Sequence, residues 1–187
     1  MTLRIHGNRL LKTLPGLETR PTPARVREAV FNVWQGAIVN CRWLDLCAGS
    51  GAIGAEALSR GADLVVGIEQ SAPACAIIRQ NWQSVARSGQ EFRVWRGDVI
   101  HQLSRLHGQS FDRIYFDPPY ASELYEPVLS AIATYRLLDA AGELAVEHNP
   151  DRSLPLPLGL LQYRQKVYGN TAVSFYCWQT AASASNY

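Results

Sequence analysis

The residues best suited to chemistry are Asp117-Pro118-Pro119-Tyr120, which directly follow the apolar residues 114–116. The Asp117 carboxylate and the Pro118 carbonyl can accept hydrogen bonds from both N–H bonds of an exocyclic amine, which is otherwise a poor nucleophile. The Tyr120 ring can stack on an extruded base and hold the nitrogen in line with a methyl donor. Asp117, Pro118 and Tyr120 are therefore the candidate catalytic residues of an amine methyltransferase, although Asp-Pro-Pro also occurs in plain turns that begin a helix.

A second candidate site is the glycine-rich loop of residues 45–54, in which Gly49, Gly51 and Gly54 form a GxGxxG pattern. Glycine permits positive φ and lets the backbone approach a nucleotide, and Glu69 can bind ribose hydroxyls from the next strand. NAD and S-adenosylmethionine both use this geometry. Asp45, four residues before Gly49, favours S-adenosylmethionine because the spacing resembles the first motif of class I methyltransferases.

Asp98 follows the predicted strand at residues 92–95, where this kind of fold presents an acid to the adenine amino group. It is also well placed to cap the next helix, and the two roles are compatible. Asn81 is expected on a helix surface. The candidate cofactor ligands are Asp45, Ala48, Gly49, Gly51, Glu69, Asp98 and Asp117.

Strand–turn–helix units must position these residues. Strands are predicted at residues 43–47, 64–68, 92–95, 113–116, 143–147, 160–168 and 172–178, and helices at 52–60, 71–87, 99–106 and 122–135. The alternation predicts an α/β Rossmann-like fold of the class I S-adenosylmethionine-dependent methyltransferase type, with a mostly parallel seven-stranded sheet and a C-terminal antiparallel hairpin. In such sheets ligands bind at the carboxyl ends of the strands, where both motifs lie.

Composition narrows the class of protein. With 187 residues, 47% hydrophobic and 18% charged, the chain is expected to be a globular domain rather than a disordered or coiled-coil protein. The longest apolar runs, such as residues 64–68, fall far short of the roughly 18 needed to cross a bilayer, and the start lacks the apolar segment of a signal peptide. The four cysteines form no CxxC pair or Cys/His cluster. We therefore expect reduced thiols, no metal, no membrane, a cytoplasmic location and a monomer.

Positive charge is concentrated at the N-terminus. Residues 1–42 hold six arginines and one lysine against two glutamates, and residues 43–187 carry a net negative charge. A β-hairpin is predicted at residues 2–13, and a helix is predicted over residues 23–35 with Thr22 as its N-cap. We therefore divide the chain into an N-terminal extension (1–40) for RNA contact or site ordering, a methyltransferase domain (41–179) and a flexible tail (180–187).

At nearly full length the chain resembles the RsmD-type family of bacterial 16S rRNA guanine-N2 methyltransferases. The resemblance rests on Arg20-Pro-Thr-x-x-Arg-Val-Arg-Glu-Ala-x-Phe-Asn32, on Leu44-Asp-Leu with the Gly49/Gly51 loop, on Glu56-Ala-Leu-Ser-Arg-Gly-Ala62 and on the DPPY run. The first of these is the most specific, and the closing Tyr168-Gly-Asn-Thr171 also resembles the family's final hairpin. Cys47-Ala48 and the small number of basic residues in the N-terminal hairpin depart mildly from the family's pattern.

The resemblance implies S-adenosylmethionine-dependent methylation of the N2 amine of one guanine. It also implies that 16S rRNA within the small ribosomal subunit, or within an assembly intermediate, is the substrate. Arg20, Thr22, Arg25 and Arg27 are then candidates for touching RNA or ordering the site. Helix capping by Thr22 and a solvated basic face are the simpler interpretations, since Glu28 could pair with Arg25 or Arg20.

Three alternatives stay open at this point. An adenine-N6 methyltransferase acting on RNA or DNA would use the same DPPY run, although a DNA enzyme usually carries a recognition insertion for which the chain leaves little room. An NAD-dependent oxidoreductase would use the same glycine loop but would need a hydride site that the sequence does not show. A non-catalytic RNA-binding module would retain the fold without the reaction.

Overall fold

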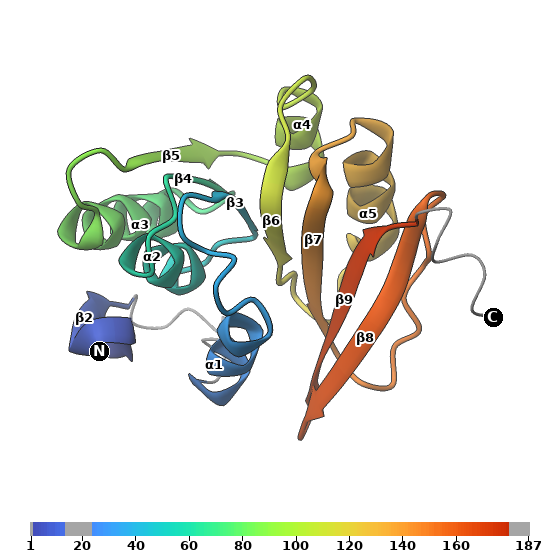
Figure 1. The fold of residues 1–187 in the computed structure, drawn as a ribbon, viewed down its shortest axis with the longest axis horizontal. Coiled ribbons are helices and arrows are strands. Elements are labelled where there is room, and N and C mark those ends of the chain that lie inside the picture. The colour runs from blue at the N-terminus through green and yellow to red at the C-terminus, as the bar shows by residue number, and fades with distance from the viewer. Residues whose placement is uncertain (1, 14–23, 180–187) are drawn as a thin grey trace.

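The computed structural model describes residues 2–13 and 24–179, which build one large mixed sheet flanked by helices and a small hairpin (Figure 1). The large sheet has seven strands in the order β5-β4-β3-β6-β7-β9-β8. Neighbours among β5, β4, β3, β6 and β7 pair in parallel, whereas β9 pairs antiparallel with both β7 and β8. The strands are β3 (Arg42–Leu46), β4 (Leu64–Glu69), β5 (Glu91–Arg96), β6 (Phe111–Phe116), β7 (Leu138–His148), β8 (Leu160–Tyr168) and β9 (Thr171–Trp178).

Helices cover both faces of this sheet, which makes three layers. The first face packs against α1 (Ala24–Val33), α2 (Ala52–Ser59) and α3 (Ala72–Val85), and the second against α4 (Val99–Ser104) and α5 (Tyr125–Thr134). Alternation along the strands divides the core in the same way: in β3, Trp43 faces the first layer and Leu44 the second. The predicted fold class is confirmed by this architecture.

The chain reverses its strand order beside β3, and this places the functional loops. β4 lies on one side of β3 and β6 on the other. In open α/β sheets, ligands bind in a crevice at such a reversal, between the loops that follow the two strands. The register sets Leu46 opposite Phe116, and the Asp117 N–H donates to the Leu46 carbonyl across a 3.4 Å N–O distance. The glycine loop and the DPPY run therefore start side by side.

A separate two-stranded hairpin, β1 (Thr2–Ile5) and β2 (Arg9–Lys12), packs against α2 and α3 (Figure 1). Its Ile5 and Leu11 side chains are buried in the first core. Polar bonds also hold it: the Ser59 hydroxyl donates to the His6 carbonyl, and an Arg9 Nη donates to the Val85 carbonyl. The hairpin is thus part of the folded unit in this structure.

Several element boundaries differ from those expected. Helix α5 begins at Tyr125 rather than at residue 122, because Ser122 donates its N–H to the Pro119 carbonyl and belongs to a turn. Strand β7 extends from Leu138, well before the predicted residue 143, through an irregularity in its pairing with β6. The expected N-cap Thr22 and the tail at residues 180–187 lie outside the described residues.

The described part of the chain bears on three expectations, which concern a membrane span, the cysteine thiols and a metal. None of its helices is long and apolar enough to cross a bilayer. Its four cysteines are all free, and residues 2–13 and 24–179 contain no cluster of three or more potential metal ligands.

Candidate active site

The glycine loop follows β3, and at two of its positions the backbone has a conformation that favours glycine. Gly49 and Gly51 have φ angles of 56° and 73°, in the left-handed region. A Cβ on Gly51 would lie 2.8 Å from the indole nitrogen of Trp82, whereas one on Gly49 would meet only a carbonyl oxygen 4.0 Å away. Gly51 is therefore required by internal packing, and Gly49 leaves open space in which a ligand can approach the backbone.

Glu69, at the end of β4, holds this loop in place. Its Oε2 accepts a hydrogen bond from the Gly49 N–H at 2.9 Å, and its Oε1 accepts one from the Ser71 N–H at 2.8 Å. A carboxylate has about four acceptor positions, so two remain for ribose hydroxyls. The predicted ribose ligand thus also sets the shape of the loop.

Asp45 is a buried acid beneath the loop. Only 2% of its surface is exposed, and its Oδ2 accepts a hydrogen bond from the Gly54 N–H at 3.0 Å. Burial raises the pKa of the Asp45 carboxyl to about 8; the Gly54 bond lowers it, and the negative charge of Glu69 raises it. A buried acid with so high a pKa is suited to a cationic ligand, which would favour its ionised form.

The charges of the four acids predicted to line the site all act on one residue, Cys47. Burial is the main cause that raises the pKa of the Cys47 thiol, and the negative charges of Glu69, Asp117, Asp45 and Asp98 raise it further. The structure therefore brings together acids from the ends of β3, β4, β5 and β6. This thiol stays protonated and is a poor nucleophile, while the surrounding negative charge suits a cationic cofactor.

Asp98 caps α4. Its Oδ1 accepts a hydrogen bond from the His101 N–H at 2.9 Å, as the helix-capping interpretation requires. The residue is exposed, and the cap fixes its side chain at the edge of the crevice. Contact with an adenine amine stays a prediction that this placement permits.

The DPPY run follows β6 as an irregular loop. Asp117 is half-buried, Pro118 is buried and Pro119 is exposed. Proline fixes φ and lacks an N–H, so this stretch of backbone has few alternative conformations. The structure therefore places Asp117 beside the glycine loop, where its negative charge acts on the Cys47 thiol.

Tyr120 is held from two directions by residues that the sequence did not single out as site residues. Its hydroxyl lies 2.8 Å from Glu147 Oε1 and 2.8 Å from the Thr171 hydroxyl, and Tyr115 donates to the other oxygen of Glu147 at 2.6 Å. Burial is the main cause that raises the pKa of the Tyr120 hydroxyl, so it stays neutral at physiological pH. Tyr120 therefore offers a fixed ring for stacking rather than a base.

Asn81 is not on a helix surface, so that prediction is wrong. It is 2% exposed, and its amide nitrogen donates to the carbonyls of Ser50 and Lys12, both at 2.9 Å. Its amide oxygen accepts the Lys12 N–H at 2.9 Å, and the neighbouring Trp82 donates to the Gly51 carbonyl at 2.7 Å. One buried amide therefore ties the N-terminal hairpin to the glycine loop.

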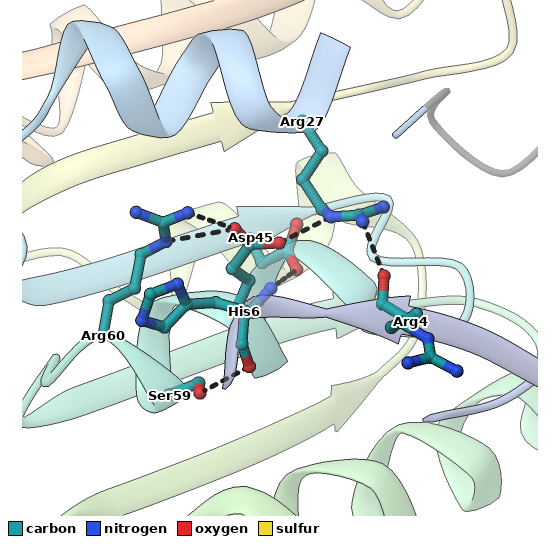
Figure 2. Close-up of polar contacts among 8 residues, drawn as sticks. Arg4, His6, Arg27, Asp45, Ser59 and Arg60 are labelled. Carbon is teal, nitrogen blue, oxygen red and sulfur yellow. Dashed lines mark hydrogen bonds and ion pairs between the residues drawn. The ribbon is translucent and has the colours of Figure 1, made fainter. Parts of the chain in front are cut away.

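Arg27 is likewise buried, and the prediction that it contacts RNA is wrong for this conformation. Its guanidinium Nε lies 2.6 Å from Glu56 Oε2, and Nη2 donates to the Arg4 carbonyl at 2.8 Å (Figure 2). Arg60 pairs with the other oxygen of Glu56, also at 2.6 Å. The pair joins α1 to α2 and to the hairpin, which leaves the site-ordering interpretation of Arg27.

The remaining predicted RNA contacts divide into two groups. Arg25 is exposed near the start of α1, and its guanidinium carbon lies 5.7 Å from the centre of the Tyr168 ring. Arg20 and Thr22 lie outside the described residues. Arg25 is thus the one predicted RNA contact that the described residues place on the surface.

The donor set fits S-adenosylmethionine. Gly49 leaves a space that a Cβ would fill, and Glu69 retains acceptor positions for a ribose. Glu69, Asp98 and Asp117 supply negative charge, to which Asp45 adds when a cation draws off its proton. The solved structures agree on the fold. "Crystal structure of SMU.776, a putative methyltransferase complexed with SAH" shares the fold with a TM-score of 0.63 at 13% identity, covering 82% of this chain and 48% of that one. The fold and the site define a class I S-adenosylmethionine-dependent methyltransferase, and S-adenosylmethionine is the cofactor of this class.

The family follows from closer relatives. The family described as "Conserved hypothetical protein 95" matches residues 3–177, and the chain belongs to it; this is the RsmD-type family whose motifs the sequence resembles. The protein named "Putative rRNA methyltransferase YlbH" of Bacillus subtilis is 33% identical, covering 90% of this chain and 92% of its own. "Ribosomal RNA small subunit methyltransferase D" of Escherichia coli K12 is 32% identical, covering 87% and 80%. The structure called "Putative methyltransferase yhhF from Escherichia coli" has a TM-score of 0.83 at 30% identity, covering 96% and 99%.

The buried Asp45 predicts that cofactor binding is linked to pH. Its pKa of about 8 leaves it mostly protonated at pH 6.5 without ligand, and a cationic ligand must drive its proton off. We expect S-adenosylhomocysteine, whose ammonium group carries the positive charge, to bind roughly tenfold more tightly at pH 8.5 than at pH 6.5. Calorimetry in buffers of different ionisation enthalpy should detect the released proton. Asp45→Asn should remove that component of the pH dependence; an unchanged profile in this variant would assign it to another group.

The shared amide of Asn81 predicts a coupled loss of stability and cofactor affinity. Asn81→Ala leaves the Lys12 N–H and the carbonyls of Lys12 and Ser50 without this partner, at a cost of about 2–3 kcal/mol in the free energy of unfolding. Gln80→Ala is the matched control, because it removes only an exposed bond to the Lys12 ammonium. Thermal unfolding with and without S-adenosylhomocysteine measures both effects. Equal behaviour of the two variants would contradict the role given to Asn81.

Proposed function

We propose that this protein transfers a methyl group from S-adenosylmethionine to the N2 amine of a guanine in small-subunit rRNA. Family membership supports the rRNA substrate, since the relatives' names specify ribosomal RNA of the small subunit. The observation that carries the amine chemistry is the position of Asp117. It lies beside the glycine loop, where its charge acts on Cys47 together with those of three other acids, and Tyr120, whose hydroxyl is held by Glu147, follows three residues later.

Asp117 and Pro118 are the proposed contacts of the target amine. When bound, S-adenosylmethionine supplies a methyl group on a cationic sulfur. The Asp117 carboxylate and the Pro118 carbonyl accept hydrogen bonds from the two N–H groups of the guanine amine. These hydrogen bonds favour a pyramidal nitrogen with its lone pair aimed at that methyl group. The amine nitrogen would gain the methyl carbon as the carbon–sulfur bond breaks, the electron pair of that bond staying on sulfur as a neutral thioether. The nitrogen would lose one proton, which leaves through the half-buried Asp117 carboxylate.

Tyr120 is proposed to stack on the guanine after it leaves its neighbours in the RNA. Because Glu147 and Thr171 hold its hydroxyl, the ring already has a defined position before substrate arrives. Such preorganisation lowers the entropic cost of aligning the base. The reaction then depends on positioning more than on acid–base catalysis, which agrees with a site that uses no histidine.

A transfer assay tests the substrate class. The protein is incubated with methyl-labelled S-adenosylmethionine and undermethylated small ribosomal subunits, with naked 16S rRNA and duplex DNA in parallel. We expect label in the rRNA of the subunits, with less in naked rRNA, since the small net charge of +2 gives little affinity for free RNA. Label in duplex DNA alone would contradict the proposal, and no label despite cofactor binding would favour the binding-module alternative.

A further inference from the structure

The exposed strand β8 carries a row of cations that leads towards the catalytic loop. Residues 162–167 are all exposed, and β8 is the outermost strand on its side of the sheet. The register pairs Arg164 with Phe175, Lys166 with Val173, and Tyr168 with Thr171. Side chains of paired residues lie on the same face of a sheet, so these three β8 residues share one face.

That face is the one covered by α1. Phe175 and Val173 belong to the core between the sheet and α1, and Arg25 of α1 lies over the Tyr168 ring. Arg25, Arg164, Lys166 and Tyr168 are therefore one continuous feature, which we call the basic row. Figure 1 shows the β8–β9 turn and α1 at the same end of the molecule.

The row ends at the candidate active site. Tyr168 pairs with Thr171, and the Thr171 hydroxyl lies 2.8 Å from the hydroxyl of Tyr120. A polymer lying along the row would therefore reach the Tyr120 ring at its end. This continuity distinguishes these cations from the exposed arginines at the opposite edge of the sheet, around β5.

The charges of the row are available to a ligand. Within residues 2–13 and 24–179, no acidic side chain forms an ion pair with Arg25, Arg164 or Lys166. Glu143, an acid of the same face, is already bound by Trp34 at 3.0 Å and lies 3.7 Å from Arg113. Arg164 also lies 5.9 Å from the ring of its neighbour Tyr163, so the tyrosines Tyr163 and Tyr168 flank the two cations along β8.

We propose that the basic row is the rRNA-docking surface, which binds phosphates beside the target guanine and guides the strand to Tyr120. Arginine, lysine and tyrosine at this spacing suit a single-stranded RNA segment, whose phosphates pair with the cations and whose bases stack on the rings. This inference rests on the proposed function. Cations on an edge strand can also serve to block strand-to-strand association, and the test must separate the two roles.

The test compares Arg164→Ala/Lys166→Ala with Arg93→Ala/Arg105→Ala, a control that removes two exposed arginines from the opposite side of the sheet. The first pair is expected to raise the KM for small subunits about tenfold or more, with kcat and S-adenosylmethionine affinity changed less than twofold. It should also reduce the slope of log affinity against log salt by about 1.5 to 2, because two phosphate contacts are lost. Arg164→Lys/Lys166→Arg keeps both charges and should retain most of the affinity.

Three results would overturn the inference. Equal KM values for the two alanine pairs would show that the row does not contact the substrate. Self-association of the β8 variant with an unchanged KM would show that the cations only protect the edge strand. A wild-type protein that neither binds nor methylates subunits would contradict both the proposed function and this inference. A wild-type protein that methylates subunits, together with a β8 variant whose KM is unchanged, would contradict the inference alone.

Discussion

Asp117→Ala is expected to reduce methyl transfer at least about a hundredfold while leaving cofactor affinity nearly unchanged. The change removes the carboxylate proposed to accept a hydrogen bond from the target amine, and preorganised contacts of this kind are worth about two to three orders of magnitude in rate. Binding persists because Asp45 and Glu69, and the glycine loop that they hold, are untouched. Single-turnover rates on small subunits and calorimetric titration with S-adenosylhomocysteine measure the two quantities separately.

Asp117→Asn is the informative companion to that variant. The amide oxygen can still accept one hydrogen bond, but the negative charge is lost, so we expect a rate between those of wild type and Asp117→Ala. Full turnover in Asp117→Ala would contradict the catalytic role given to this residue. A large loss of cofactor binding without a further loss of rate would reassign Asp117 to the cofactor.

Arg27→Ala is expected to lower the free energy of unfolding by about 3 kcal/mol. The substitution leaves the carboxylate of Glu56 buried with one of its two cationic partners, Arg60, and removes the bond to the Arg4 carbonyl. In a chain of this length the loss corresponds to roughly 6–12 °C in Tm. Chemical denaturation of the purified protein gives the value directly.

Arg25→Ala is the matched control on the same helix, because Arg25 is exposed. Its stability should change by less than about 0.5 kcal/mol. The two substitutions are then expected to change different quantities: Arg27→Ala lowers stability, and Arg25→Ala raises the KM for the substrate. A stable Arg27→Ala protein with a raised KM would restore the RNA-contact interpretation that the burial of Arg27 argues against.

The periodicity of hydrophobic residues and the glycines and prolines that end the strands were enough to predict the parallel sheet. Residues 43–47 and 113–116 alternate between two buried layers, and each ends at a glycine or proline loop that stops the strand. The position of Asp117 beside the glycine loop followed from the general rule for ligands in open α/β sheets. That rule needs only strand order, so the core of the site was predictable.

Arg27 and Asn81 were predicted on the surface because the spacing of nearby residues does not identify their buried partners. Arg27 precedes Val30 and Phe31 by three and four positions, which places it on the buried face of α1, but the charge made the surface interpretation preferable. Its partner Glu56 is the lone charge in the helix Ala52–Ser59. A lone acid in an apolar helix is the available signal, because a buried charge needs a partner.

Asn81 carried a similar signal. It lies three residues after Ile78 and four before Val85, on the same face as both of these buried side chains. Its role still depends on Lys12 and Ser50, which are distant in sequence. The Glu147–Tyr120–Thr171 clamp likewise joins three separate elements, and the pairing of β7 with β9 that assembles it is a property of the whole sheet.

The most direct test of the central claim is the identity of the methylated nucleoside. Small subunits labelled by the protein are digested to nucleosides, and the labelled species is separated by chromatography beside authentic standards. We expect N2-methylguanosine, which should be absent when Asp117→Ala replaces the wild-type protein. Label in N6-methyladenosine would leave the fold and the use of the DPPY run in place but contradict the assignment to guanine.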